Sequence, residues 1–140
     1  MTLTQMTPDE IAGAARDLAD ASPQTILRWA VKRLHPRLLM STAFGAEGCC
    51  IIHMLAEIQP KVHLFNLDTG YQFPETLELR ERIKEKYGME VEYVRCDTTV
   101  AQYEEKHGGP LYVLQPDQCC HDRKVIPLRR ALVGYSAWIS

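Results

Sequence analysis

The chain has 140 residues, of which 46% are hydrophobic and 24% are charged, a composition typical of one globular domain with a substantial core. These figures exclude a disordered or collagen-like chain. The formal net charge of −2 argues against a general nucleic-acid binder, which usually carries a basic excess. The longest apolar stretches fall far short of the roughly 18 residues that span a bilayer. The first ten residues show no basic segment followed by an apolar one, so we expect no secretory signal.

Five cysteines make a poor disulfide framework, because four of them stand in two adjacent pairs. The pairs are Cys49–Cys50 and Cys119–Cys120, and Cys96 stands alone. In a chain without an export signal, we expect reduced thiols in the cytoplasm, some of them available to bind a metal.

The first predicted elements are two helices within residues 1–36, which we expect to precede the sheet as a helical preface. Thr7 and Glu10 have the spacing of a capping box, with a proline directly after the threonine, and they predict a helix over residues 7–20. A second helix is predicted over residues 22–35, because its apolar residues recur at helical spacing.

Four short apolar runs then predict strands that are buried on both faces. The runs cover residues 38–40, 62–65, 91–94 and 137–139, and helical patterns cover 47–58 and 74–87. Strands that alternate with helices in this way predict an α/β fold with a doubly wound parallel sheet, in a single nucleotide-binding domain over residues 1–140. In such sheets, ligands bind beyond the carboxyl ends of the strands, near the point where the strand order reverses.

The first loop at that edge is Ser41-Thr42-Ala43-Phe44-Gly45-Ala46-Glu47-Gly48. Its hydroxyls, its open backbone N–H groups and the helix N-terminus that follows can cradle phosphate or sulfate. It matches neither the dinucleotide-binding pattern nor the Walker loop. A strand-to-helix turn that merely tolerates small residues is the alternative, and the local pattern leaves both interpretations open.

The second loop at that edge closes the second predicted strand with Leu67, Asp68, Thr69 and Gly70. A carboxylate and a hydroxyl at this place suit a ribose or a metal-bound phosphate. An Asx-type turn explains the same residues through the backbone conformation alone, and on the local pattern we favour the turn.

The adjacent thiols Cys119 and Cys120 are the sharpest local signal. Residues 121–130 hold four basic residues against one acid, namely Arg123, Lys124, Arg129 and Arg130 against Asp122. Nearby cations stabilise the thiolate, which is the form that binds iron or zinc. Two buried apolar thiols are the alternative, which fits poorly with so many charges. We expect a short helical turn that carries the cysteines, separated by Pro127 from a helix that runs to Val133.

The other thiols are interpreted differently. Cys49 and Cys50 lie among apolar residues, where free cysteine packs as a small hydrophobe. A metal site of four thiols from both pairs is disfavoured, because adjacent helix positions diverge by about 100°. Cys96 is expected as a lone thiol near the ligand edge. Among the histidines, we expect local packing or hydrogen bonds for His53 and His63, and solvent around His107 and His121.

Taken together, four motifs resemble those of the adenylyl-sulfate and phosphoadenylyl-sulfate reductases of sulfate assimilation. The motifs are residues 41–47, Leu67-Asp68-Thr69-Gly70, Phe73-Pro74-Glu75-Thr76 and residues 119–128, and the match runs from about residue 38 to the last residue. The resemblance implies a Rossmann-like fold of the adenine nucleotide alpha-hydrolase type. It also implies reduction of an activated sulfate to sulfite, with release of the adenosine nucleotide and with thioredoxin or a similar dithiol as electron donor.

The resemblance further implies roles for single residues. Residues 41–47 take the part of a modified pyrophosphate loop near the phosphosulfate, and Leu67 with its neighbours takes the part of an adenosine contact. Cys119 and Cys120 supply two of the four thiolates of a 4Fe-4S cluster. Lys124, the expected catalytic residue, places positive charge between cluster and substrate, and Arg123 is an expected substrate contact. The cysteine pair matches the cluster-bearing branch, which implies adenylyl sulfate rather than its 3′-phosphorylated form.

We expect a fragment of a longer protein, because the chain stops one residue after the last predicted strand, where a functional loop is expected. The family's second cysteine pair, its nucleophilic cysteine and its basic loop are then expected beyond Ser140, and the chain alone is not expected to turn over substrate. Two other interpretations stay open. One is an ATP-using relative of the same fold, such as an adenylating enzyme or a sulfate adenylyltransferase subunit. The other is a non-catalytic nucleotide- or metal-binding module. The oligomeric state also stays open, a homo-oligomer included.

Overall fold

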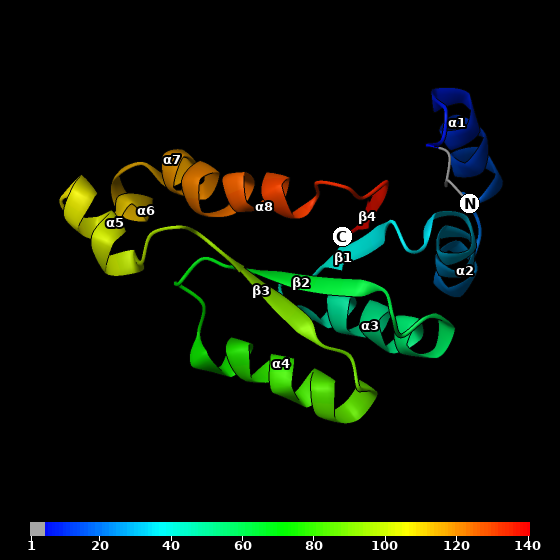
Figure 1. Cartoon of the computed structure of the whole chain (residues 1–140), viewed down its shortest axis with the longest axis horizontal. Coiled ribbons are helices and arrows are strands. Elements are labelled where there is room, and N and C mark those ends of the chain that lie inside the picture. Colours follow the sequence, from blue (N-terminus) through cyan, green and yellow to red (C-terminus); the bar gives the residue numbers. More distant parts are fainter. Residues whose placement is uncertain (1–4) are drawn as a thin grey trace.

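The computed structural model describes residues 5–140, and the strands within them form one four-stranded parallel sheet (Figure 1). Residues 1–4 belong to the predicted helical preface and to the stretch without a signal pattern, and they lie outside the described residues. The strands are β1 (Leu38–Ser41), β2 (His63–Asp68), β3 (Val91–Arg95) and β4 (Ala137–Ile139). Their order is β3-β2-β1-β4, so the chain moves outward from β1 to β3 and then returns to the other side of β1.

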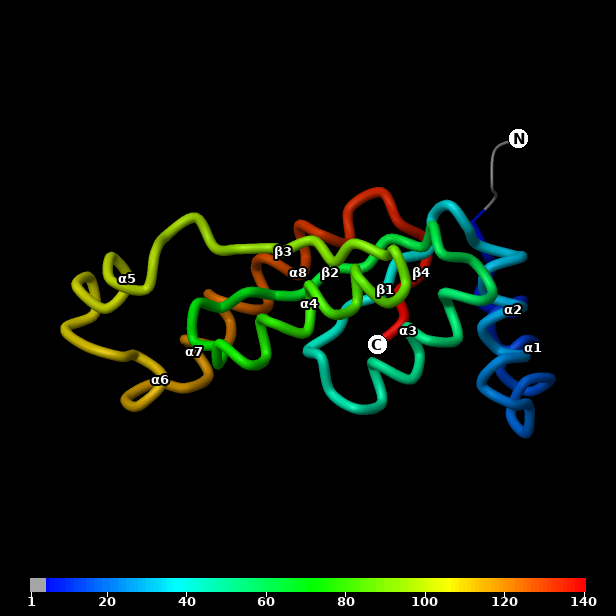
Figure 2. The backbone as a smooth tube through the Cα atoms, turned by 90° about the horizontal axis from the view of Figure 1, so that it is seen from below, coloured from blue at the N-terminus to red at the C-terminus, as the bar shows by residue number. Residues whose placement is uncertain are grey.

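Helices cover both faces of this sheet, which confirms the predicted doubly wound architecture (Figure 1). They are α1 (Pro8–Asp17), α2 (Pro23–Leu34), α3 (Ala46–Ile58), α4 (Pro74–Tyr87), α5 (Val100–His107), α6 (Leu111–Leu114), α7 (Pro116–Cys120), the π-helical turn η1 (His121–Val125) and α8 (Ile126–Ala131). Right-handed crossovers place α3 and α4 on one face, and the return through α8 on the other. Figure 2 shows α1 and α2 at one end of the sheet, and α5, α6 and α7 at the end where β3 leads into α5. No helix within residues 5–140 is both long and apolar enough to cross a membrane.

Capping boxes mark where two of the described helices, α1 and α5, begin. The Thr7 hydroxyl accepts from the Glu10 N–H at 3.3 Å and the Thr7 N–H donates to the Glu10 carboxylate at 2.7 Å, which confirms the predicted capping box. Thr99 and Gln102 form a second capping box at the start of α5. Neither α5 nor α6 was predicted from the sequence.

Burial differs between the central and the edge strands. Residues 38–40 of β1 and 64–66 of β2 are buried, as predicted for strands that are covered on both faces. In β3 only Val91 is buried, and β4 is at most half-buried, so the prediction of full burial is wrong for both. Both are edge strands of the described sheet, where fewer side chains cover the backbone.

The cysteine-bearing segment is one continuous helical path from α7 through η1 to α8, which ends at Ala131. The predicted separation at Pro127 is therefore wrong. A proline within a helix lacks an N–H and crowds the turn before it. Here Pro127 is the second residue of α8, and the wide turn η1 directly before it loosens that crowding.

Two side chains differ in exposure from their predictions. Cys50 is exposed rather than packed in the core, because adjacent positions on α3 diverge and only Cys49 is half-buried. His107 is half-buried rather than solvated, with its ring 4.6 Å from that of Tyr103. The other histidine predictions are confirmed: His53 contacts Tyr87, His63 contacts Glu92, and His121 is exposed.

The main core lies between the sheet and helices α2, α3 and α4, and Leu55 of α3 is fully buried in it. We predict that Leu55→Ala lowers the free energy of unfolding by about 2–5 kcal/mol, because the lost side chain leaves a cavity. The matched control is Leu114→Ala, whose side chain is 68% exposed, with an expected change of at most about 0.5 kcal/mol. Urea unfolding monitored by circular dichroism measures both, and equal losses would contradict this assignment of the core.

Candidate functional site

A cavity of about 730 Å³ lies beyond the carboxyl ends of β1 and β2, with α7 and η1 on its far side. A volume of this size is typical of small-molecule and cofactor sites. The lining residues come from three segments and are Ser41, Thr42, Ala43, Asn66, Leu67, Thr69, Tyr71, Gln72, Phe73, Tyr112, Pro116, Cys119, Cys120, Arg123 and Lys124. The location agrees with the rule for doubly wound sheets, since the strand order reverses beside β1.

The first loop presents two hydroxyl residues to the cavity, Ser41 and Thr42. The Thr42 hydroxyl accepts from the Phe44 N–H at 3.0 Å and so closes the turn. Phe44 has a positive φ of 61° and is buried in the core. Gly45 directly precedes α3 and offers no side-chain cap, which leaves the N–H groups of that helix end to an outside acceptor. An anion at this place would meet a partial positive charge.

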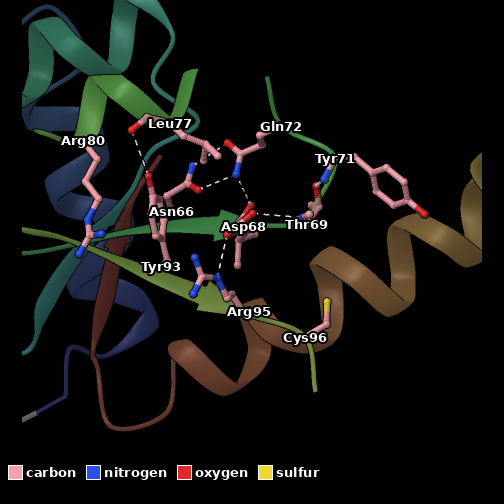
Figure 3. Close-up of polar contacts among 12 residues, drawn as sticks. Asn66, Asp68, Thr69, Tyr71, Gln72, Leu77, Arg80, Tyr93, Arg95 and Cys96 are labelled. Carbon is pink, nitrogen blue, oxygen red and sulfur yellow. Dashed lines mark hydrogen bonds and ion pairs between the residues drawn. The ribbon is translucent and has the colours of Figure 1, made fainter. Parts of the chain in front are cut away.

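The amide side chains of Asn66 and Gln72 bond to each other (Figure 3), and Asn66 also joins the first loop to the second. Asn66 is 1% exposed, and its Nδ2 donates to the Thr42 carbonyl at 2.8 Å and to Gln72 Oε1 at 3.2 Å. Gln72 returns a hydrogen bond from Nε2 to Asn66 Oδ1 at 2.8 Å. The two loops therefore hold a fixed spacing across the cavity. A signal for this pair was present in the sequence, because Asn66 is a polar residue within an otherwise apolar strand.

Asp68 closes the turn of the second loop and lies outside the cavity lining. It accepts from the Gly70 N–H at 3.1 Å, which confirms the Asx-type turn, and from Arg95 Nε at 2.8 Å (Figure 3). Burial raises the pKa of Asp68, but the hydrogen bonds from Arg95 and Gly70 outweigh it and hold the pKa below its usual value. Asp68 is therefore a carboxylate at neutral pH.

Arg123 is the buried cation of the site, at 4% exposure. Its Nε donates to the Thr69 carbonyl at 2.7 Å, and its guanidinium lies 5.7 Å and 5.1 Å from the ring centres of Tyr71 and Tyr103. No acidic side chain forms an ion pair with Arg123 within the described part of the chain. Main-chain carbonyls and aromatic rings thus take the place of a carboxylate around this charge.

The two tyrosines beside Arg123 donate to carboxylates. Tyr71 donates to Glu104 at 3.0 Å, and Tyr103 donates to Asp122 at 2.8 Å. Burial and the Glu104 carboxylate raise the pKa of Tyr71 to about 12. Burial and the Asp122 carboxylate likewise raise the pKa of Tyr103. Both tyrosines are therefore neutral hydrogen-bond donors at physiological pH.

The paired thiols lie on the side of the cavity that α7 forms. Cys119 is 6% exposed and packs near Tyr103 and Leu111, whereas Cys120 is exposed. Lys124 is also exposed and lines the same cavity. The basic residues further along are turned to other partners or to solvent, since Arg130 pairs with Asp97 at 2.8 Å and Arg129 is exposed.

These thiols alone do not fit a complete iron–sulfur site. A 4Fe-4S cluster binds four cysteine thiolates. Within residues 5–140, no group of three or more His, Cys, Asp or Glu side chains is arranged to hold a metal ion. The described residues therefore do not form the four-thiol metal site that both cysteine pairs would share.

Some of the predicted site residues line the cavity, and others do not. Eight predicted residues line it: Ser41, Thr42, Leu67, Thr69, Cys119, Cys120, Arg123 and Lys124. Six others lie next to it without lining it: Phe44, Gly45, Ala46, Glu47, Asp68 and Gly70. Of the other seven lining residues, Ala43 lies in the predicted loop 41–47 and Phe73 in a matched motif. The remaining five were not predicted: Asn66, Tyr71, Gln72, Tyr112 and Pro116. Tyr112 had no signal, because it lies on the unpredicted helix α6.

Comparisons with known proteins agree on one family. The model of the phosphoadenosine phosphosulfate reductase domain matches residues 37–140. Adenosine 5′-phosphosulfate reductase 1 of Bacillus subtilis is 38% identical over 117 residues, which are 83% of this chain and 50% of that protein. Phosphoadenosine 5′-phosphosulfate reductase of Gloeobacter violaceus is 39% identical over 127 residues, which are 90% of this chain and 53% of that protein. The chain thus spans about half the length of these curated relatives.

A solved structure is similar in fold as well. The phosphoadenylyl-sulfate reductase of Candida auris, solved as a phosphate complex, aligns with a TM-score of 0.79 and 30% sequence identity, over 96% of this chain and 68% of that one. The fold is accordingly the adenine nucleotide alpha-hydrolase-like fold expected from the sequence. Because the domain match covers most of the sequence, the chain belongs to the phosphoadenosine phosphosulfate reductase family.

Proposed function

We propose that this chain carries the nucleotide-binding part of an enzyme that reduces adenylyl sulfate, or its 3′-phosphorylated form, to sulfite with release of AMP or of adenosine 3′,5′-bisphosphate. The observation that supports this most strongly is one cavity lined by the loop that leads into the uncapped α3, by two cations and by two thiols. The positive charge of this cavity would attract an anionic nucleotide, and the thiols would lie near its sulfur.

The nucleotide is proposed to lie with its phosphosulfate at residues 41–47 and its adenosine against residues 67–70. The hydroxyls of Ser41 and Thr42 and the N-terminus of α3 would bind the anionic groups. The relative from Candida auris, whose title names a phosphate complex, supports an anion in this family of folds. Aromatic rings from Tyr71, Phe73 and Tyr112 line the same cavity and offer apolar surface to the base.

The proposed reaction moves two electrons from thiols to sulfur. A thiolate attacks the sulfur of the sulfuryl group, the bond between that sulfur and the bridging phosphate oxygen breaks, and the nucleotide leaves as its phosphate. A second thiol then attacks the cysteine Sγ of the S-sulfocysteine, the bond from Sγ to the sulfonate sulfur breaks, and sulfite leaves while a disulfide forms. We propose thioredoxin or a similar dithiol as the donor that completes this exchange, in the cytoplasm. Lys124 would stabilise the negative charge on the leaving group, because it lies exposed on the cavity wall.

Cys119 and Cys120 are proposed as two of the four thiolates of a 4Fe-4S cluster. When bound, such a cluster would place redox-active iron beside the substrate. Adjacent cysteines favour the cluster-bearing branch of the family, and with it adenylyl sulfate over the 3′-phosphorylated form. The names of the relatives include both substrates, so the comparison of the two nucleotides belongs in the experiment.

We predict that Lys124→Ala weakens the binding of adenylyl sulfate about tenfold, because a charged hydrogen bond to the ligand is lost. Isothermal titration calorimetry with adenylyl sulfate, AMP and adenosine 3′,5′-bisphosphate measures the effect and ranks the nucleotides. Lys61→Ala serves as a matched control, because Lys61 is exposed just before β2, at the opposite edge of the sheet. Wild-type affinity in Lys124→Ala, or an equal loss in both variants, would count against the proposed substrate pose.

We also predict that the purified chain of 140 residues retains no stable cluster and releases no sulfite from adenylyl sulfate in the presence of a dithiol. Two thiols at the cavity are half of the usual ligand set. Iron and sulfide analysis, visible absorption and a sulfite assay test this together. A stable four-iron centre or steady sulfite release from this chain would show the proposal to be wrong.

A further inference from the structure

The helical segment that carries Cys119 contains the wide turn η1, and this turn changes which carbonyls are bonded. The N–H of Ile126 donates to the carbonyl of His121, five residues earlier. In a regular α-helix that N–H donates to the residue four positions earlier, which here is Asp122. The Asp122 carbonyl therefore loses its usual donor. Such turns are rare and recur at functional sites.

The carbonyl of Arg123 also lacks its usual donor, because the residue four positions later is Pro127, which has no N–H. The thiol of Cys96, which directly follows β3, takes the place of the missing donor at both carbonyls. Its thiol donates to the Arg123 carbonyl at 3.4 Å and lies 3.8 Å from the Asp122 carbonyl. Figure 3 shows its side chain beside this helical segment. The half-buried thiol thus bonds the two carbonyls that the wide turn and the proline set free.

The side chain of Arg123 is a second connection from η1 to the ends of the strands. In addition to the Thr69 carbonyl at 2.7 Å, the guanidinium reaches the Thr98 carbonyl, with both terminal nitrogens at 3.4 Å. Thr69 follows β2 and Thr98 follows β3. The buried guanidinium therefore joins the helical segment of Cys119 to the residues that follow β2 and β3. Its bonded N–H groups point to the protein's own backbone rather than to a ligand.

The loop that receives the guanidinium has no room for a larger residue. Gly70 has a φ of +84°, and a Cβ there would lie 2.5 Å from Val100 Cγ2 and 3.3 Å from a terminal nitrogen of Arg123. The glycine therefore permits a close approach between this loop, α5 and the arginine. Three parts of the chain form this contact: the loop at Gly70, α5 through Val100, and η1 through Arg123.

We propose that Arg123 and Cys96 are positioning residues, which hold the wide turn against the ends of β2 and β3 and thereby fix how Cys119 and Lys124 face the cavity. The resemblance at the level of sequence implies a substrate contact for Arg123, and the geometry points instead to a clamp. This inference rests on the proposed function only for the importance of Cys119 and Lys124. The alkylation rate of Cys119 reports its position without nucleotide or turnover.

The first test is the alkylation rate of Cys119 by iodoacetamide in the folded chain, resolved from that of Cys120 by peptide mass spectrometry. In Arg123→Lys the charge remains but the planar fork is lost. We therefore expect the lysine variant to raise the Cys119 rate about tenfold or more, toward the rate of the exposed Cys120, as Arg123→Met does. The exposed Arg129→Lys is the matched control, with an unchanged rate. Wild-type protection of Cys119 in Arg123→Lys would overturn the clamp, because charge alone would then be sufficient.

The second test compares Cys96→Ser with Cys96→Ala, and it does not depend on the folding of the Arg123 variants. Serine keeps a hydroxyl donor for the two freed carbonyls, whereas alanine removes the donor. We expect Cys119 to stay protected in the serine variant and to react about tenfold faster in the alanine variant. Equal protection in both would overturn the role of Cys96. No nucleotide is present in either test, so a failure of the proposed reaction leaves these outcomes unchanged.

Discussion

The hydrogen bond from the buried guanidinium of Arg123 to the Thr69 carbonyl is the contact on which the site depends. It joins residues 54 positions apart in the sequence, and it brings the helix with the paired thiols to the end of β2. A buried charge without a carboxylate partner is costly to keep unless carbonyls and rings surround it. Arg123 has both, in Thr69 and in the tyrosines on either side. The wall of the cavity and the position of Cys119 follow from this one placement.

The topology of the sheet makes that contact possible. Right-handed crossovers carry the chain outward from β1 to β3 on one face, and the return to β4 must then cross the other face. The return path passes the carboxyl ends of β1, β2 and β3, which is where α7 and η1 lie. The loops after β1 and β2 lie at the same edge and are tied together by Asn66 and Gln72. The first loop, two cations and two thiols consequently share one cavity, although they come from three distant segments.

Local patterns predicted the parts of this molecule that are set by neighbouring residues. The Thr7 capping box, the alternation of strands and helices and the Asx-type turn at Asp68 are all decided within a few positions. The four matched motifs identified the family and eight of the residues that line the cavity. The positions of β3 and β4 at the edges of the sheet could not be predicted, because the residues of one strand do not determine the order of the strands.

Contacts between residues far apart in the sequence determine the features that local patterns did not predict. Pro127 indicated a break between two helices, but the wide turn before it keeps the helical path continuous, and a thiol from the end of β3 completes that turn. Arg123 sits in a basic run that suggests solvent or a ligand, and its burial depends on residues 69 and 98, far away in the sequence. Tyr112 reaches the cavity from α6, a helix of four residues without a sequence pattern of its own.

The most direct measurement is hydrogen–deuterium exchange of the chain with and without adenylyl sulfate. The account predicts slower exchange in residues 41–48, 66–73 and 119–124 when the nucleotide is bound, with no change along α4. A second groove, lined by Cys49, Arg82 and Lys86, lies between α3 and α4 and provides the internal comparison. Slower exchange confined to that groove, or no slowing in the three segments at saturating nucleotide, would contradict the account.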